Sequence, residues 1–217
     1  YNATRRLRQQ GYTGQITAVT AHAESYDRQK CLEAGCDGYL GKPLDQETIV
    51  DAVRRTRLEK TRAIVSKARR DIGQLTSHEL RLIGAALYWA EGEKQKEHKG
   101  QASAQVVFSN TDPRMLRMFV AFLHRCCGIE PAALRFRIYL HDTADAIDAR
   151  TYWYHQLGLE TITTAPVTWK RHKPSVHRMN VGAGYHGLLR IIVPRSTDLN
   201  RRISGWIDGA CEAGVTG

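Results

Sequence analysis

The sequence predicts an α/β segment over residues 1–57 that is joined by a helix to an α+β domain over residues 75–214. Residues 15–20 have the β-branched content of a buried strand, and a helix, a second strand and another helix follow it in the order of a doubly wound sheet. Residues 47–72 contain neither Pro nor Gly and predict one long helix. After residue 75, helices that end at glycines are interspersed with strands in a different order.

The first segment has a strand–helix–strand–helix order. The strand at 15–20 precedes a helix at 24–34, which ends at Gly35. A short strand follows at 38–40, and then the long helix begins. Together these elements make half of an open, doubly wound sheet. The end of the long helix, residues 58–74, is interpreted as a helical connector to the second segment.

The composition places the chain among folded proteins. Its 217 residues are 42% hydrophobic and 25% charged, as in globular domains and unlike disordered chains. No apolar run approaches the ~20 residues needed to cross a bilayer, so no membrane association is expected. The five cysteines lack the spacing of a zinc site or a disulfide framework. We therefore expect reduced thiols and a cytoplasmic protein.

The net charge of +10 indicates an anionic partner. Residues 1–74 contain 14 Lys and Arg against 9 Asp and Glu, and residues 75–217 contain 18 against 13. The excess is therefore spread over both segments, and charge alone does not locate a binding face. Nucleic acid is the leading class of partner, and the alternative is a basic protein that binds no polyanion.

Two motifs in the first segment carry a family resemblance. The stretch TAHA begins at Thr20, and the stretch AGCDGYLGKPLD begins at Ala34. With these motifs, residues 1–57 resemble the C-terminal half of a phosphorelay receiver domain, the flavodoxin-like domain of response regulators and hybrid histidine kinases. In that family the acceptor aspartate and the acidic pair that holds Mg²⁺ lie in the other half. We expect the phosphoacceptor half to be absent, so that the receiver domain is truncated.

The receiver resemblance implies roles for three residues. Thr20 would be the switch hydroxyl, Tyr39 the switch aromatic residue, and Lys42 the ammonium group that pairs with the acyl phosphate. The Lys42–Pro43 bond would be cis. Without the acceptor half we expect these residues to be idle. A histidine kinase or phosphotransfer protein would be a partner only of a full-length parent.

The second segment starts with a capping box at Thr76 and Glu79, which opens a largely uncharged helix up to Glu91. The pattern then predicts, in order, a strand at 105–109, a helix from Asp112 to about Cys127, a strand at 134–141, a helix at 144–157, strands at 167–170 and 188–193, and a helix capped by Ser196. The order is α-β-α-β-α-β-β-α, or αββαββα if neighbouring pieces merge. Helices would cover one face of a mixed or antiparallel sheet.

The other face of this sheet would be open and basic. The strand at 134–141 alternates between apolar and polar residues. The side chains expected on its open face are Arg135, Arg137, Tyr139 and His141. Further basic residues lie in or beside a later hairpin, namely Lys170, Arg171, Lys173 and Arg178. Such a face can lie against a phosphate backbone, or it can be a solvated face whose charges pair with nearby acids.

A second resemblance involves the helix at 77–91. Its stretch AALYWAEG, which ends at Gly92, resembles a divergent LAGLIDADG motif. Residues 75–210 are similar to a mostly actinobacterial group of proteins that share the LYWAEG, FSNTDP and WKRHKP stretches. In LAGLIDADG homing endonucleases, two such helices pack at the centre of a dimer, and each delivers an acid to divalent metal ions. The resemblance therefore implies a homodimer through 77–91, with Glu91 as the catalytic residue and Mg²⁺ ligand.

These observations favour a DNA-binding module joined to a receiver remnant, with a regulatory role in an intact parent protein. One alternative is a Mg²⁺-dependent DNA endonuclease of the LAGLIDADG type that acts as a homodimer. The other is a signalling module that binds protein and catalyses nothing.

Overall fold

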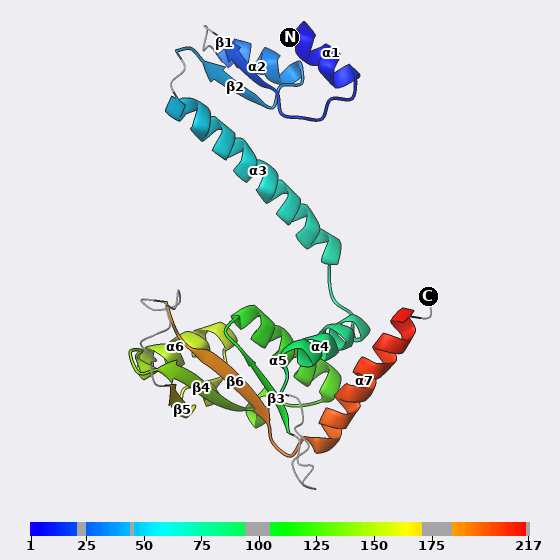
Figure 1. Cartoon of the computed structure of the whole chain (residues 1–217), viewed down its shortest axis with the longest axis vertical. Coiled ribbons are helices and arrows are strands. Elements are labelled where there is room, and N and C mark those ends of the chain that lie inside the picture. The colour runs from blue at the N-terminus through cyan, green and yellow to red at the C-terminus, as the bar shows by residue number, and fades with distance from the viewer. Residues whose placement is uncertain (21–24, 44–45, 94–104, 171–183, 216–217) are drawn as a thin grey trace. The chain divides into compact units, whose positions relative to one another are not determined.

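The computed structural model describes residues 1–20, 25–43, 46–93, 105–170 and 184–215 (Figure 1). The chain divides into two compact units, Tyr1–Gln74 and Leu75–Gly217. No helix in the described ranges is both long enough and apolar enough to cross a membrane.

The first unit contains one small parallel sheet. Its elements are α1 (Asn2–Gln9), β1 (Thr17–Thr20), α2 (Ser25–Glu33), β2 (Gly38–Gly41) and α3 (Gln46–Ile72). Strands β1 and β2 are parallel, with Thr17 opposite Gly38 and Thr20 opposite Gly41. The expected strand–helix–strand–helix order is therefore confirmed, and α1 precedes it. Helix α3 is continuous over 27 residues, as the absence of Pro and Gly predicts.

A polar contact closes the sheet end at which both strands begin. The Arg8 guanidinium donates hydrogen bonds to the carbonyls of Tyr12, Gly14 and Gly35 and forms an ion pair with Asp37. The Asp37 carboxylate also accepts a hydrogen bond from the backbone N–H of Ile16, at 2.7 Å. One arginine thus links α1, the loop before β1 and the start of β2.

The second unit is an α+β domain. Its elements are α4 (Ser77–Glu91), β3 (Val106–Asn110), α5 (Pro113–Cys127), the 3-10 turn η1 (Pro131–Ala133), β4 (Arg135–His141), α6 (Ala146–Leu157), η2 (Glu160–Ile162), β5 (Val167–Lys170), β6 (Leu188–Val193) and α7 (Thr197–Val215). The expected eight-element order is confirmed. The merged order αββαββα is wrong, because α5 separates β3 from β4 and α6 separates β4 from β5.

The four strands form a mixed sheet in the order β3-β6-β4-β5. Strand β6 is antiparallel to both β3 and β4, whereas β4 and β5 are parallel. A parallel pair requires a crossover connection, and α6 with η2 provides it. Of the two sheet types expected, the mixed one is therefore correct.

The caps of the helices agree with the sequence pattern. The Thr76 hydroxyl accepts a hydrogen bond from Glu79 N, and the Glu79 carboxylate accepts one from Thr76 N, which completes the capping box. The Thr76 hydroxyl also donates to the Glu79 carboxylate at 2.7 Å, and this hydrogen bond together with the one from Thr76 N lowers the pKa of the Glu79 carboxyl. Asp112 caps α5, and Gly128 ends it in the left-handed conformation.

Ser196 has a different role from the one expected. Helix α7 begins directly after it, and the Ser196 carbonyl accepts a hydrogen bond from Asn200 N at 2.9 Å. Its hydroxyl, however, accepts from Val106 N at 2.7 Å and donates to the Val193 carbonyl at 2.6 Å. The side chain therefore links the edge strand β3 to the end of β6.

The core lies between one face of the sheet and the helices. Phe108 of β3 stacks on Phe119 of α5, with ring centroids 4.2 Å apart. Helix α4 approaches α5 closely at Gly84, where a Cβ atom would lie 2.1 Å from Cγ of Phe122. Tyr88 of α4 accepts a hydrogen bond from the Asn200 side chain at 2.7 Å, which ties α4 to α7. These contacts make α4 the central helix of the layer.

The close approach at Gly84 predicts that Gly84→Ala destabilises the second unit. Overpacking of a close-packed core should lower its free energy of unfolding by about 1–3 kcal/mol. The measurement is urea unfolding followed by tryptophan fluorescence. All four tryptophans lie in this unit, so the signal reports on it alone.

The matched control is Gly205→Ala on α7, where no atom lies within 4 Å of the added Cβ. This change should stabilise the helix by about 0.5–1 kcal/mol, because alanine loses less backbone entropy than glycine. Equal effects of the two substitutions would contradict the packing of α4 on α5.

Candidate nucleic-acid interface

The sheet of the second unit has one covered and one open face. On β4 the side chains of Phe136, Ile138 and Leu140 are at most 4% exposed, because they face the helices. Arg135 and Arg137 lie on the opposite face and are exposed. The period of two along a strand separates these sets. The expectation that Arg135 and Arg137 lie on an uncovered face is confirmed.

Neighbouring strands add to the open face. The register places Arg190 of β6 opposite Arg137, and Thr168 of β5 opposite Tyr139. Lys170, two residues after Thr168, lies on the same face and is exposed. We refer to the side chains of Arg135, Arg137, Tyr139, Lys170 and Arg190 as the basic face.

Tyr139 lies at the centre of the basic face. The ammonium group of Lys170 is 5.2 Å from the centroid of its ring, and the guanidinium of Arg190 is 4.9 Å from it. Both distances permit a cation–π attraction. Cations contributed by the two flanking strands are therefore held beside one aromatic ring.

Arg190 is anchored by further contacts. Its Nε donates to the Ser109 hydroxyl at 3.1 Å, and its Nη1 lies 3.7 Å from the carboxylate of Glu93. Arg137 donates to the Thr168 hydroxyl at 3.1 Å. Arg190 and Glu93 were not among the site residues predicted from the sequence. The single charge in the apolar stretch LLRIIV was the available signal for Arg190, since an arginine in such a strand needs a polar side.

His141 does not belong to the basic face, and its expected exposure was wrong. Its side chain is only 5% exposed. The ring stacks on Tyr185 at 5.5 Å between centroids, and its Nδ1 is 3.4 Å from the Lys170 carbonyl. Strand β5 and Tyr185 cover this end of β4, which alternation within one strand does not reveal. Three other expected contacts, Arg171, Lys173 and Arg178, lie outside the described residues.

Glu91 lies beside the outer strand of the sheet. It is the last residue of α4, and its side chain is exposed. Gly92 forms a β-bridge with Phe108, and the next N–H, of Glu93, donates to the Val107 carbonyl at 3.0 Å. The end of α4 is thereby fixed to β3.

The metal centre that the LAGLIDADG resemblance implies is not assembled within one described chain. In the ranges that the structure describes, no group of three or more His, Cys, Asp or Glu side chains could hold a metal ion. A Mg²⁺ centre needs several oxygen ligands, and Glu91 does not bring such a set together. Because the resemblance implies a site shared by two copies of the chain, the role of Glu91 as a metal ligand stays a prediction.

In the first unit, two of the expected switch residues lie at the same edge of the sheet. Thr20 ends β1, and Lys42 directly follows β2. The backbone N–H of Lys42 donates to the Thr20 carbonyl at 2.8 Å. The Lys42–Pro43 peptide bond is cis, as the receiver resemblance implies. Tyr39 is half-buried on β2, opposite Ala18.

A comparison with known protein families finds a match for the first unit. Residues 1–54 match the response regulator receiver domain. The match confirms the receiver resemblance for the first unit. No solved structure matches the chain, and the LAGLIDADG resemblance of the second unit stays a prediction.

Curated relatives are sensor kinases. The chain is 42% identical over 65 residues to "Sensor histidine kinase RcsC" of Salmonella typhimurium, a match that covers 29% of this chain and 7% of the kinase. It is 53% identical over 38 residues to "Histidine kinase 1" of Arabidopsis thaliana, covering 18% of this chain and 3% of that protein. The chain thus spans 7% or less of the length of these relatives.

Proposed function

We propose that the second unit binds DNA through the basic face. The observation that carries this proposal is the group of four cations on the uncovered side of the sheet, contributed by β4, β5 and β6, two of which lie beside Tyr139. Within the described ranges, the carboxylate that forms an ion pair with this group is that of Glu93, in contact with Arg190. A surface with this excess of positive charge attracts a phosphate backbone.

The chemistry of the individual side chains supports phosphate contacts. Guanidinium groups present several N–H donors in a planar fork, which suits phosphate oxygens. Arg135 and Arg137 are separated by one residue on a strand, so their side chains emerge about 7 Å apart on one face. The ring of Tyr139 adds a flat surface on which a base or sugar can pack.

We propose a regulatory role for the first unit. Receiver domains function in two-component phosphorelays, and residues 1–54 match that domain. In an intact parent protein, a histidine kinase or phosphotransfer protein would bind and phosphorylate the receiver domain. DNA binding by the second unit would be the activity that this phosphorylation regulates. In the described residues, the chemistry available for this is Lys42 beside Thr20, whose carbonyl accepts a hydrogen bond from the Lys42 N–H.

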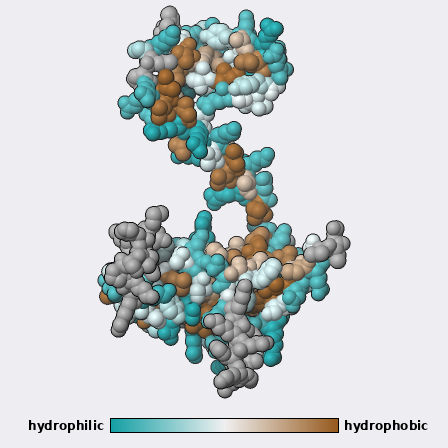
Figure 2. Space-filling model, in the orientation of Figure 1, coloured by the Kyte–Doolittle hydropathy of each residue, from teal (hydrophilic) through white to brown (hydrophobic). Residues whose placement is uncertain are grey.

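A second proposal, self-association of the second unit, is based on an apolar surface. Between α4 and α7 lies an apolar groove of about 380 Å³, lined by Leu82, Ala85, Ala86, Trp89, Ile207, Ala210, Cys211 and Gly214. Figure 2 shows hydrophobic residues gathered over these two helices. Leu82 and Trp89 are 44% and 55% exposed. Large apolar side chains grouped in this way commonly mark protein contacts, and we propose a homodimer through α4.

DNA binding through the basic face can be tested by replacing both Arg135 and Arg137 with Ala. The double variant should bind a short labelled duplex more weakly by about 1–3 kcal/mol, because two phosphate contacts are lost. The slope of log K against log salt should also become shallower by about two. Fluorescence anisotropy titrations at several salt concentrations measure both quantities.

The matched control removes two arginines from the helical side of the unit, Arg125→Ala with Arg201→Ala. Arg201 is paired with Asp198 at 3.0 Å, and Arg125 donates to the Leu75 carbonyl. This control has the same net charge as the test variant and should keep nearly normal affinity. If both variants lose equal affinity, binding follows net charge and the basic face is not the interface. If the unaltered protein binds no DNA, the protein-binding alternative is favoured.

The apolar groove predicts that Trp89→Glu abolishes self-association. A carboxylate at this position would be buried without a partner in the dimer, at a cost of several kcal/mol. Sedimentation velocity over a range of concentrations should show a monomer for Trp89→Glu. Ile147→Glu on α6 is the control, since Ile147 is 73% exposed and does not line the groove. A concentration-independent monomer for the unaltered chain would refute the dimer.

A further inference from the structure

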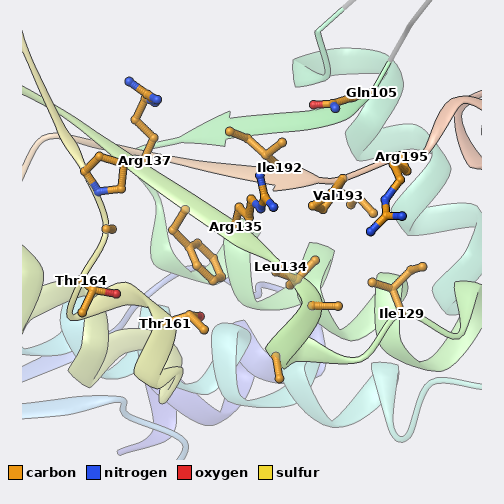
Figure 3. A pocket seen from close by; sticks show the side chains of 16 residues that line it. Gln105, Ile129, Leu134, Arg135, Arg137, Thr161, Thr164, Ile192, Val193 and Arg195 are labelled. Carbon is orange, nitrogen blue, oxygen red and sulfur yellow. The ribbon is translucent and has the colours of Figure 1, made fainter.

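A pocket of about 870 Å³ adjoins the basic face at the end where β4 begins (Figure 3). Strand β4, the end of β6 and the segment after η2 form its walls. The polar side chains that line it are Gln105, Arg135, Arg137, Thr161, Thr164 and Arg195. Among the described lining residues, three are arginines and none is acidic. Such a lining favours a ligand with more than one negative charge.

Two of these arginines, Arg135 and Arg195, differ from Arg137 and from Arg190 of the basic face. Arg137 is held by Thr168, and Arg190 by Ser109 and Glu93. By contrast, the side chain of neither Arg135 nor Arg195 forms a hydrogen bond or an ion pair with another residue in the part of the chain that the structure describes. Both guanidinium groups therefore retain all their donors for a ligand.

The backbone at Arg195 is the second observation. Its φ of 52° lies in the left-handed region, and it is the one non-glycine residue with positive φ among the described residues. Glycine is favoured there because a Cβ atom crowds the backbone. A strained residue that is exposed and contributes a free guanidinium to a pocket suggests a function rather than a structural need.

We infer that this pocket binds the terminal phosphate of a DNA strand whose backbone lies on the basic face. This inference rests on the proposed DNA binding and specifies which part of the DNA is recognised. A phosphomonoester carries up to two negative charges, whereas a phosphodiester inside the strand carries one. Two free guanidinium groups at a concave site match the former, and the Thr161 and Thr164 hydroxyls supply further donors.

The test compares duplexes of one sequence that end in a 5′-phosphate, a 3′-phosphate or hydroxyl groups only, with the full chain. One of the phosphorylated duplexes should bind about tenfold more tightly than the hydroxyl duplex. Adenosine monophosphate serves as a competitor, since it carries the same phosphomonoester without a strand.

The variant Arg195→Gly tests whether the Arg195 side chain binds the terminal phosphate or only stabilises the fold. The variant should lose the preference for the phosphorylated end. Its melting temperature should stay the same or rise, because glycine relieves the left-handed backbone. Arg135→Gln should also remove the preference, whereas Arg201→Gln on α7 should keep it.

The possible failures are distinguishable. Equal binding of all three duplexes, with affinity still dependent on Arg137, would overturn the pocket assignment and leave DNA binding in place. Binding of adenosine monophosphate without binding of any duplex would overturn both proposals and assign the pocket to free nucleotides. If Arg195→Gly and Arg135→Gln both keep the preference for phosphorylated ends, the terminal phosphate binds at another site. That result would also overturn the inference.

Discussion

The second unit depends on one constraint, the two-residue period of strands that are buried on a single face. Phe136, Ile138 and Leu140 belong to the core, and the arginines between them must point the other way. A slip of one residue in the pairing of β4 with β6 would bring charged groups among the helices. The same burial that stabilises the sheet therefore sets the positions of the guanidinium groups on its open side.

The first unit is stabilised differently. Among its described residues, the buried apolar side chains are Cys31, Ala34 and Cys36, whereas Leu7 and Val19 are 40% and 46% exposed. A core of this size contributes little hydrophobic free energy. The polar contact centred on Arg8 and Asp37 adds hydrogen bonds that tie α1 to the segments before both strands. Both features fit half of a doubly wound sheet.

Sequence reasoning recovered what is encoded locally. The capping box at Thr76, the glycine stop at Gly128 and the alternation along β4 each depend on residues close together in the chain. The basic face was therefore anticipated in its central strand. Contacts that depend on tertiary pairing were not, and they include the burial of His141 under Tyr185, the contact of Glu93 with Arg190, and the contribution of Arg195 to a pocket beside β4.

The bridge between Gly92 and Phe108 has a mechanical consequence. Because α4 ends at Glu91 and the chain pairs with β3 one residue later, α4 cannot slide along its axis without moving the outer strand. Glu93, the next residue, carries the carboxylate that faces Arg190. A displacement of α4 along its axis would therefore also move the Glu93 carboxylate relative to Arg190, a cation in the middle of the sheet.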